Sequence, residues 1–162
     1  MYKRQRRLTN AWASPREYYQ DSTYFDSKLP FVYEPSIQEL NNDMTYEMLH
    51  NFVSYNENRN LIIVDENKKI INVSDGWTRN CGYTYDEVYD QSFRLLQGTD
   101  TCLETIKMFE EELKTENKAN MNIINYSKSG LPMQCHVDCI ELQDTRGSYF
   151  ENPKFLCEMI IL

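Results

Sequence analysis

The chain has 162 residues and a formal net charge of −8, and 41% of its residues are hydrophobic. This length allows one folded domain with an extension, and the negative charge argues against a nucleic-acid-binding surface on the body of that domain. No apolar run approaches the ~20 residues that a membrane-spanning helix needs. Five cysteines at irregular spacing indicate no disulfide framework, so we expect reduced thiols and an intracellular protein, either cytoplasmic or nuclear.

Residues 1–35 predict an extended arm that is partly disordered, because they lack hydrophobic periodicity and contain three prolines. A basic cluster lies at the start of this arm, at Lys3, Arg4, Arg6 and Arg7. Such a cluster suits a nuclear-import signal or an anionic-surface contact, and it equally suits a solvated tail, which we favour.

Two short helices are expected in residues 36–58. Ser36 and Glu39 have the spacing of a capping box, in which the two side chains satisfy free amides at a helix start. Hydrophobic residues then recur at helical spacing and predict a second, amphipathic helix over residues 44–55.

Residues 59–162 predict a mixed fold. Two β-branched runs, residues 61–64 and 69–73, indicate a hairpin, and short helices follow it. Thr101 and Glu104 are expected to form a capping box at the start of a longer amphipathic helix. Alternating or apolar runs predict three further strands over residues 121–127, 133–142 and 154–162. The order indicates an α+β fold, with a five-stranded antiparallel sheet and helices on one face.

Four local motifs in this segment resemble the PAS sensory domains, and within them the LOV branch. The motifs are Ser74-Asp75-Gly76-Trp77, Cys81-Gly82-Tyr83-Thr84, Asp90-Gln91-Ser92-Phe93-Arg94-Leu95-Leu96-Gln97-Gly98 and Asn125-Tyr126-Ser127-Lys128-Ser129-Gly130. The resemblance implies the PAS fold. In LOV domains the third motif carries a cysteine that bonds to a light-excited flavin, and Phe93 stands at that position here.

Two narrower resemblances stay open. The aromatic arm before the domain is similar to that of fungal photoreceptors of the Vivid and white-collar type. Cys81-Gly82-Tyr83 and Cys135-His136-Val137-Asp138 are similar to the PAS cap of ether-a-go-go potassium channels.

The LOV resemblance implies a flavin pocket in which three residues of this chain match cofactor-contacting positions. These residues are Arg94, Gln97 and Asn125. The Arg94 guanidinium has the forked shape that suits a phosphate, although in an acidic protein it equally suits a surface salt bridge.

Besides Phe93, four positions depart from the LOV pattern. Ser92 replaces an asparagine with a shorter side chain. Glu110 replaces a second arginine and would place a carboxylate near a phosphate. Cys135 replaces a second asparagine and is a weak hydrogen-bonding group. Met159 replaces the signalling glutamine. The changes favour an apolar pocket.

Strand alternation indicates which side chains face this pocket. The expected pocket-lining residues are Phe93, Cys135, Val137, Cys139, Cys157 and Met159. We expect the Phe93 ring to occupy the volume that a flavin ring needs, where overpacking costs roughly 1–3 kcal/mol. We therefore expect no cofactor, with FMN or FAD as the alternative.

Enzymatic and metal-binding functions find little support. The two histidines fall in different predicted elements, and no catalytic triad or phosphate loop is recognisable. Cys135, His136 and Cys139 match no standard zinc spacing, and alternation points His136 away from the two cysteines.

Two functions remain. The first is a non-catalytic PAS sensory or interaction module without flavin, which mediates dimerisation in signalling or transcription regulation. Its expected partner is itself or another PAS-containing protein, and its expected interface is the outer sheet face at His136, Asp138 and Ile140. The second is a LOV-like sensor that binds flavin or another small ligand and signals without a cysteinyl adduct.

Overall fold

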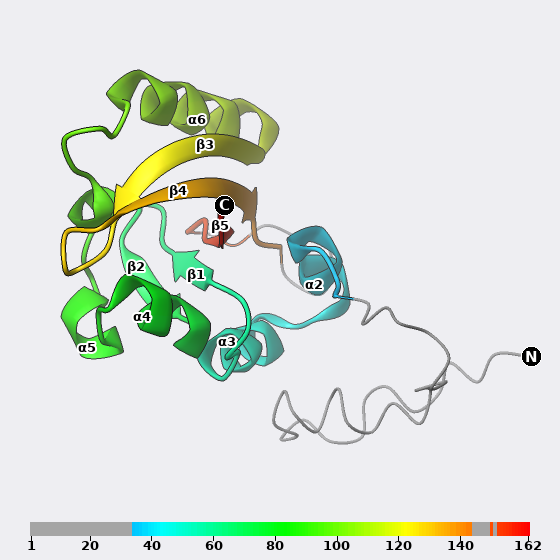
Figure 1. Ribbon diagram of the computed structural model, residues 1–162. Coiled ribbons are helices and arrows are strands. Elements are labelled where there is room, and N and C mark those ends of the chain that lie inside the picture. The colour runs from blue at the N-terminus through cyan, green and yellow to red at the C-terminus, as the bar shows by residue number, and fades with distance from the viewer. Residues whose placement is uncertain (1–33, 144–149, 151) are drawn as a thin grey trace, which may run out of the picture.

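A computed structural model describes residues 34–143, 150 and 152–162, so nearly all of the predicted arm of residues 1–35 lies outside the described residues. The chain forms short helices and one sheet (Figure 1). The helices are α2 (Ile37–Asp43), α3 (Tyr46–Ser54), α4 (Asp75–Cys81), α5 (Tyr85–Val88), the 3-10 helix η1 (Phe93–Leu96) and α6 (Leu103–Glu116). In the described part of the chain, no helix is long and apolar enough to cross a bilayer.

Five antiparallel strands form the sheet in the order β2-β1-β5-β4-β3. The strands are β1 (Leu61–Val64), β2 (Ile70–Val73), β3 (Lys118–Tyr126), β4 (Pro132–Glu141) and β5 (Phe155–Ile161). The two hairpins therefore lie at opposite edges, and the last strand pairs with both of them. This topology confirms the predicted five-stranded antiparallel sheet.

Side-chain caps start the short helices. The capping box at Ser36 and Glu39 is present, with the Ser36 N–H donating to the Glu39 carboxylate at 2.8 Å. At α4, the buried Ser74 hydroxyl accepts from the Trp77 N–H at 3.1 Å and donates to the Arg59 carbonyl at 2.6 Å. Ser74 thus ties the start of α4 to the segment that enters β1.

The capping box predicted at Thr101 is wrong. Cys102 precedes α6 and makes no side-chain cap bond. The Thr101 hydroxyl instead accepts from the Gly98 N–H at 2.9 Å and donates to the Ile124 carbonyl at 2.7 Å. A carbonyl on β3 therefore engages the hydroxyl that the capping box needed.

Helices cover both faces of the sheet. The segment from α4 to α6 packs on one face, around buried residues such as Trp77, Ile123 and Cys157. On the other face, α2 and α3 bury a second cluster that includes Leu61, Ile63, Leu156 and Ile140. All four residues of β1 are consequently buried, because both of its faces are covered.

Candidate functional site

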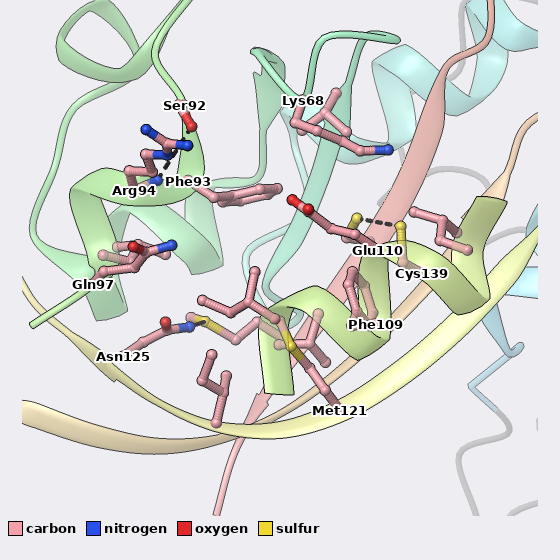
Figure 2. A pocket seen from close by; sticks show the side chains of 18 of the residues that line it. Lys68, Ser92, Phe93, Arg94, Gln97, Phe109, Glu110, Met121, Asn125 and Cys139 are labelled. Carbon is pink, nitrogen blue, oxygen red and sulfur yellow. Dashed lines mark hydrogen bonds between the residues drawn. The ribbon is translucent and has the colours of Figure 1, made fainter. Parts of the chain in front are cut away.

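A cavity of about 520 Å³ lies between the sheet, η1 and α6 (Figure 2). Its floor consists of apolar and sulfur-containing side chains from four strands: Ile62, Val64, Met121, Ile123, Val137, Cys139, Cys157 and Met159. The helices contribute further apolar side chains, including Leu96, Ile106, Phe109 and Leu113. Small-molecule sites in proteins typically span about 300–1,000 Å³, so this cavity has the size of a ligand site.

Phe93 lines this cavity, and a volume of about 520 Å³ remains beside its ring. Phe93 is the first residue of η1, and its ring points toward the Glu110 carboxylate on the facing helix α6 (Figure 2). The ring therefore lies between η1 and α6 and packs against the buried cluster that includes the floor of the cavity. With no sulfur at position 93, the chain has no thiol at the position that the LOV resemblance implies for the adduct cysteine.

The three residues that the LOV resemblance implies as flavin contacts, Arg94, Gln97 and Asn125, all line the cavity. Asn125 is buried, and its amide Nδ2 donates to the Met159 thioether at 3.6 Å. A thioether is a weak acceptor, so this amide can exchange the contact for a stronger one to a ligand. The Arg94 guanidinium has no hydrogen-bond or ion-pair partner among the described residues.

Two cations that the sequence reasoning missed, Lys68 and Lys107, also line the cavity. Lys107 precedes Glu110 by three residues, so the two side chains share a face of α6, and this spacing was the available signal. Lys68 belongs to the turn between β1 and β2, and its Nζ lies 4.2 Å from the centroid of the Phe155 ring. The cavity lining therefore includes the Glu110 carboxylate and three cations, Lys68, Arg94 and Lys107.

Four further predicted pocket residues, Val137, Cys139, Cys157 and Met159, lie on the cavity wall. Cys135 does not: it is buried in the core beside the cavity, where its thiol donates to the Met133 carbonyl at 3.4 Å. Burial raises the pKa of the Cys135 thiol. In the described part of the chain, no cluster of three metal-ligating side chains is present.

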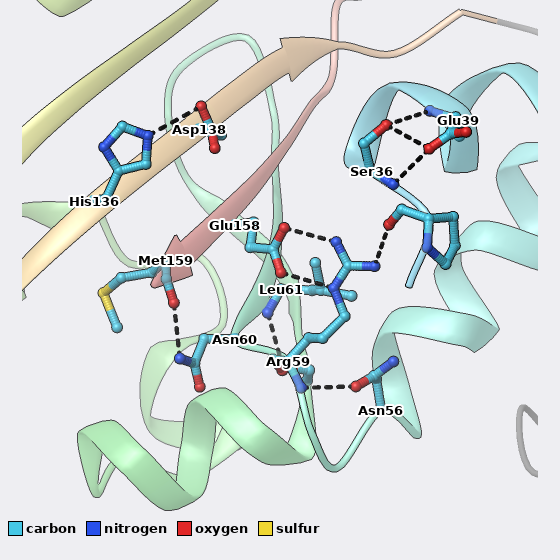
Figure 3. A network of polar contacts seen from close by, with 12 residues as sticks. Ser36, Glu39, Asn56, Arg59, Asn60, Leu61, His136, Asp138, Glu158 and Met159 are labelled. Atoms are coloured by element: carbon cyan, nitrogen blue, oxygen red, sulfur yellow. Dashed lines mark hydrogen bonds and ion pairs between the residues drawn. The ribbon is translucent and has the colours of Figure 1, made fainter. Parts of the chain in front are cut away.

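The outer face of the sheet carries His136 and Asp138, with His136 Nε2 3.4 Å from Asp138 Oδ1 (Figure 3). The third residue predicted for an interface, Ile140, lies on the same face but is only 7% exposed. It packs into the cluster beneath α2 and α3. Ile140 therefore supports the packing of these helices and is not accessible to a partner while they are in place.

A profile described as PAS domain matches residues 59–158. The chain belongs to the PAS domain family. Over 71 residues it is 32% identical to blue-light-activated histidine kinase 1 of Erythrobacter litoralis (strain HTCC2594). That match covers 43% of this chain and only 20% of the kinase, so this PAS chain corresponds to a small part of that protein.

Solved PAS structures share the fold. A light-oxygen-voltage domain studied with a flavin analogue is 22% identical with a TM-score of 0.57, over 64% of this chain and 77% of that one. The light-state LOV domain of the photoreceptor Aureochrome1 is 20% identical with a TM-score of 0.56, over 64% of this chain and 80% of that one. The PAS domain of the fruit-fly ELK potassium channel is 21% identical with a TM-score of 0.57, over 64% of this chain and 86% of that one. The predicted PAS fold with LOV-like relatives is thus confirmed.

The residues present do not fit the light-driven cysteinyl-flavin reaction. Phe93 provides no nucleophile, and the Asn125 amide contacts the Met159 thioether. The size of the cavity and the polar side chains of Gln97 and Asn125 nevertheless suit an organic ligand.

Proposed function

We propose that this PAS domain is a non-catalytic sensory module that binds an amphipathic anion in its cavity and signals without flavin-cysteine chemistry. The cavity of about 520 Å³, with an apolar floor and cations beside it, carries this proposal. Apolar area removed from water contributes about 25 cal/mol per Å², so the floor provides affinity for a hydrocarbon body.

The cations favour an acidic head group on the ligand. Among the described residues, the charged groups of Arg94 and Lys107 have no ion-pair partner. The whole chain carries a net charge of −8, so these two cations form a local positive region beside the cavity. Gln97 and Asn125 add polar contacts that orient the ligand.

Strand β5 offers a route from the cavity to a partner. Met159 faces the cavity, while the next residue, Ile160, is exposed on the outer face and pairs in register with His136. A ligand that presses on β5 also changes the outer face of the sheet. We therefore place the contact to a partner, either a second copy or another PAS-containing protein, at His136, Asp138 and Ile160.

Native purification followed by denaturation tests the ligand. We expect mass spectrometry of the released fraction to show an organic acid with an apolar body. If the protein is purified empty, dansyl-undecanoic acid is a suitable fluorescent probe, and it should bind at one site per chain.

Two variants of α6 provide a matched test of the site. Ile106 lines the cavity, while Met108 on the same helix is 63% exposed and does not line it. Ile106→Trp should abolish probe binding, and Met108→Trp should leave it unchanged. Equal binding by both variants would place the probe elsewhere and contradict the proposal.

Flavin is the second candidate, because Gln97 and Asn125 lie in the cavity wall as the LOV resemblance implies. A stoichiometric flavin absorbance in the purified protein would replace the proposed anion with FMN or FAD.

A further inference from the structure

Two thiols meet at the floor of the cavity. Cys139 on β4 and Cys157 on β5 are register partners, and the Cys157 thiol donates to Cys139 Sγ at 2.7 Å (Figure 2). Both cysteines are free, with exposed fractions of 2% and 3%. The separation exceeds the ~2.05 Å of a disulfide bond, but the two sulfur atoms already face each other.

The position of this pair in the ladder suits a cross-strand bond. The Leu142 N–H donates to the Lys154 carbonyl, and the Leu162 N–H donates to the Gln134 carbonyl. Because hydrogen-bonded and non-hydrogen-bonded pairs alternate in antiparallel ladders, both ends of the ladder make Cys139–Cys157 a non-hydrogen-bonded pair. In such pairs the Cα atoms lie about 4.5 Å apart, within the range of about 4.4–6.8 Å that a disulfide tolerates.

We propose that Cys139 and Cys157 form a redox-sensitive dithiol that a small hydroperoxide, entering through the cavity, oxidises to a disulfide. One thiolate attacks a peroxide oxygen and breaks the O–O bond, giving a sulfenic acid, and the departing hydroxide takes up a proton to become water. The second thiol attacks the sulfenic sulfur, the S–S bond forms, and a second water leaves. The two thiols lose two electrons and two protons, and hydrogen peroxide gains them.

The cavity gives this pair its selectivity. Burial raises the pKa of Cys139 well above its ordinary value, so few thiolates are present and the pair reacts more slowly than an exposed thiol, while the cavity walls limit access to small oxidants. Lys68, which also lines the cavity, opposes this shift. The exposed Cys102 differs, since a hydrogen bond with Thr105 lowers the pKa of its thiol. A small neutral peroxide enters the cavity, whereas a bulky oxidant reaches only Cys102.

The bond would join β4 to β5 at the base of the ligand cavity, next to Met159. Oxidation of the dithiol is thus a second signal, besides ligand binding, to the same domain. This signal does not require the proposed organic anion, because the peroxide reaches the dithiol through the cavity when no anion is bound.

Peptide mapping of the full chain tests the dithiol. The reduced protein is treated with hydrogen peroxide, remaining thiols are blocked with N-ethylmaleimide under denaturing conditions, and the digest is analysed by mass spectrometry. We expect a linked peptide that joins Cys139 to Cys157, lighter by two hydrogen atoms and cleaved by dithiothreitol. If the peroxide-treated protein shows oxidised Cys102 but no linked peptide, the proposal is overturned.

Variants separate the pair from the other thiols. Cys139→Ser and Cys157→Ser should remove the linked peptide. The matched control is Cys135→Ser, which changes a buried thiol on the same strand and face and should leave the linked peptide intact. The wild-type map stands by itself if a serine variant fails to fold.

The route of the oxidant has its own test. Ile106→Trp, which fills the cavity, should slow formation of the linked peptide several-fold relative to Met108→Trp. Equal rates in the two variants would contradict oxidation through the cavity.

Discussion

Arg59 binds Glu158 through two hydrogen bonds, with its Nε 2.7 Å from Oε1 and a terminal nitrogen 2.6 Å from Oε2 (Figure 3). Its other terminal nitrogen donates to the Pro35 carbonyl at 2.7 Å. The Arg59 and Glu158 side chains are 9% and 15% exposed, so the pair is largely shielded from water. Arg59 therefore links the segment just before α2 to the outer face of β5 by hydrogen bonds.

Glu158→Gln should destabilise the fold, because it removes the charged acceptor of two Arg59 hydrogen bonds in a shielded site. Breaking one side of a buried ion pair costs about 3–5 kcal/mol, and since the amide keeps part of the geometry we expect about 2 kcal/mol. Urea unfolding measures this loss. Glu112→Gln on the exposed surface of α6 is the control, with a change within about 0.5 kcal/mol. A Glu158→Gln protein as stable as the control would refute the anchoring role.

The stability of the domain should fall as the pH is lowered from 7.5 to 5.5, partly through His50. Burial lowers the pKa of His50 below its usual 6.5. The unfolded state therefore binds the proton first, so the stability contribution is complete above pH 6.5 and is lost as the pH falls toward the folded pKa. Urea midpoints across this range measure the effect. His50→Gln should flatten the slope, and an unchanged slope would assign it to other groups.

The placement of the helices shows what the sequence could and could not predict. The capping box at Ser36 and the apolar period of residues 44–55 identify helices, but a helical period does not say which sheet face a helix covers. The signal for helices on both faces of the sheet was the continuous apolar run of β1. A strand buried on both faces reads in this way, whereas a strand with one solvated face alternates.

The sequence predicts the lining residues of the site better than the volume of the cavity. Strand alternation indicates Val137, Cys139, Cys157 and Met159 as pocket residues because it needs only the period of two. Whether Phe93 fills the space depends on where η1 holds its backbone, which no pattern of residue types encodes. Lys68 enters the site through a turn with a left-handed conformation at φ 61°, and its side-chain direction follows from that turn.

Two isoleucines on the outer face should separate folding from association. Ile140→Asp places a carboxylate in the cluster under α2 and α3, and we expect a loss of about 3 kcal/mol or more in unfolding free energy. Ile160 is 45% exposed, so Ile160→Asp should leave stability nearly unchanged and weaken the self-association that we propose. Urea unfolding and sedimentation equilibrium measure the two effects. Wild-type chains that remain monomeric at high concentration would contradict a homodimer.

The cations beside the cavity should set the affinity for an anionic ligand. Arg94→Gln and Lys107→Gln each remove one positive charge that lines the cavity, and we expect roughly 2- to 5-fold weaker binding of dansyl-undecanoic acid. Lys114→Gln is the matched control, because Lys114 is an exposed cation on the same helix that does not line the cavity. Titrations at low and high salt measure the effect, and salt should narrow the difference since these charges are solvent-exposed. If the control weakens binding equally, the cations act through the general charge of the chain and the acidic head group is not bound at the cavity.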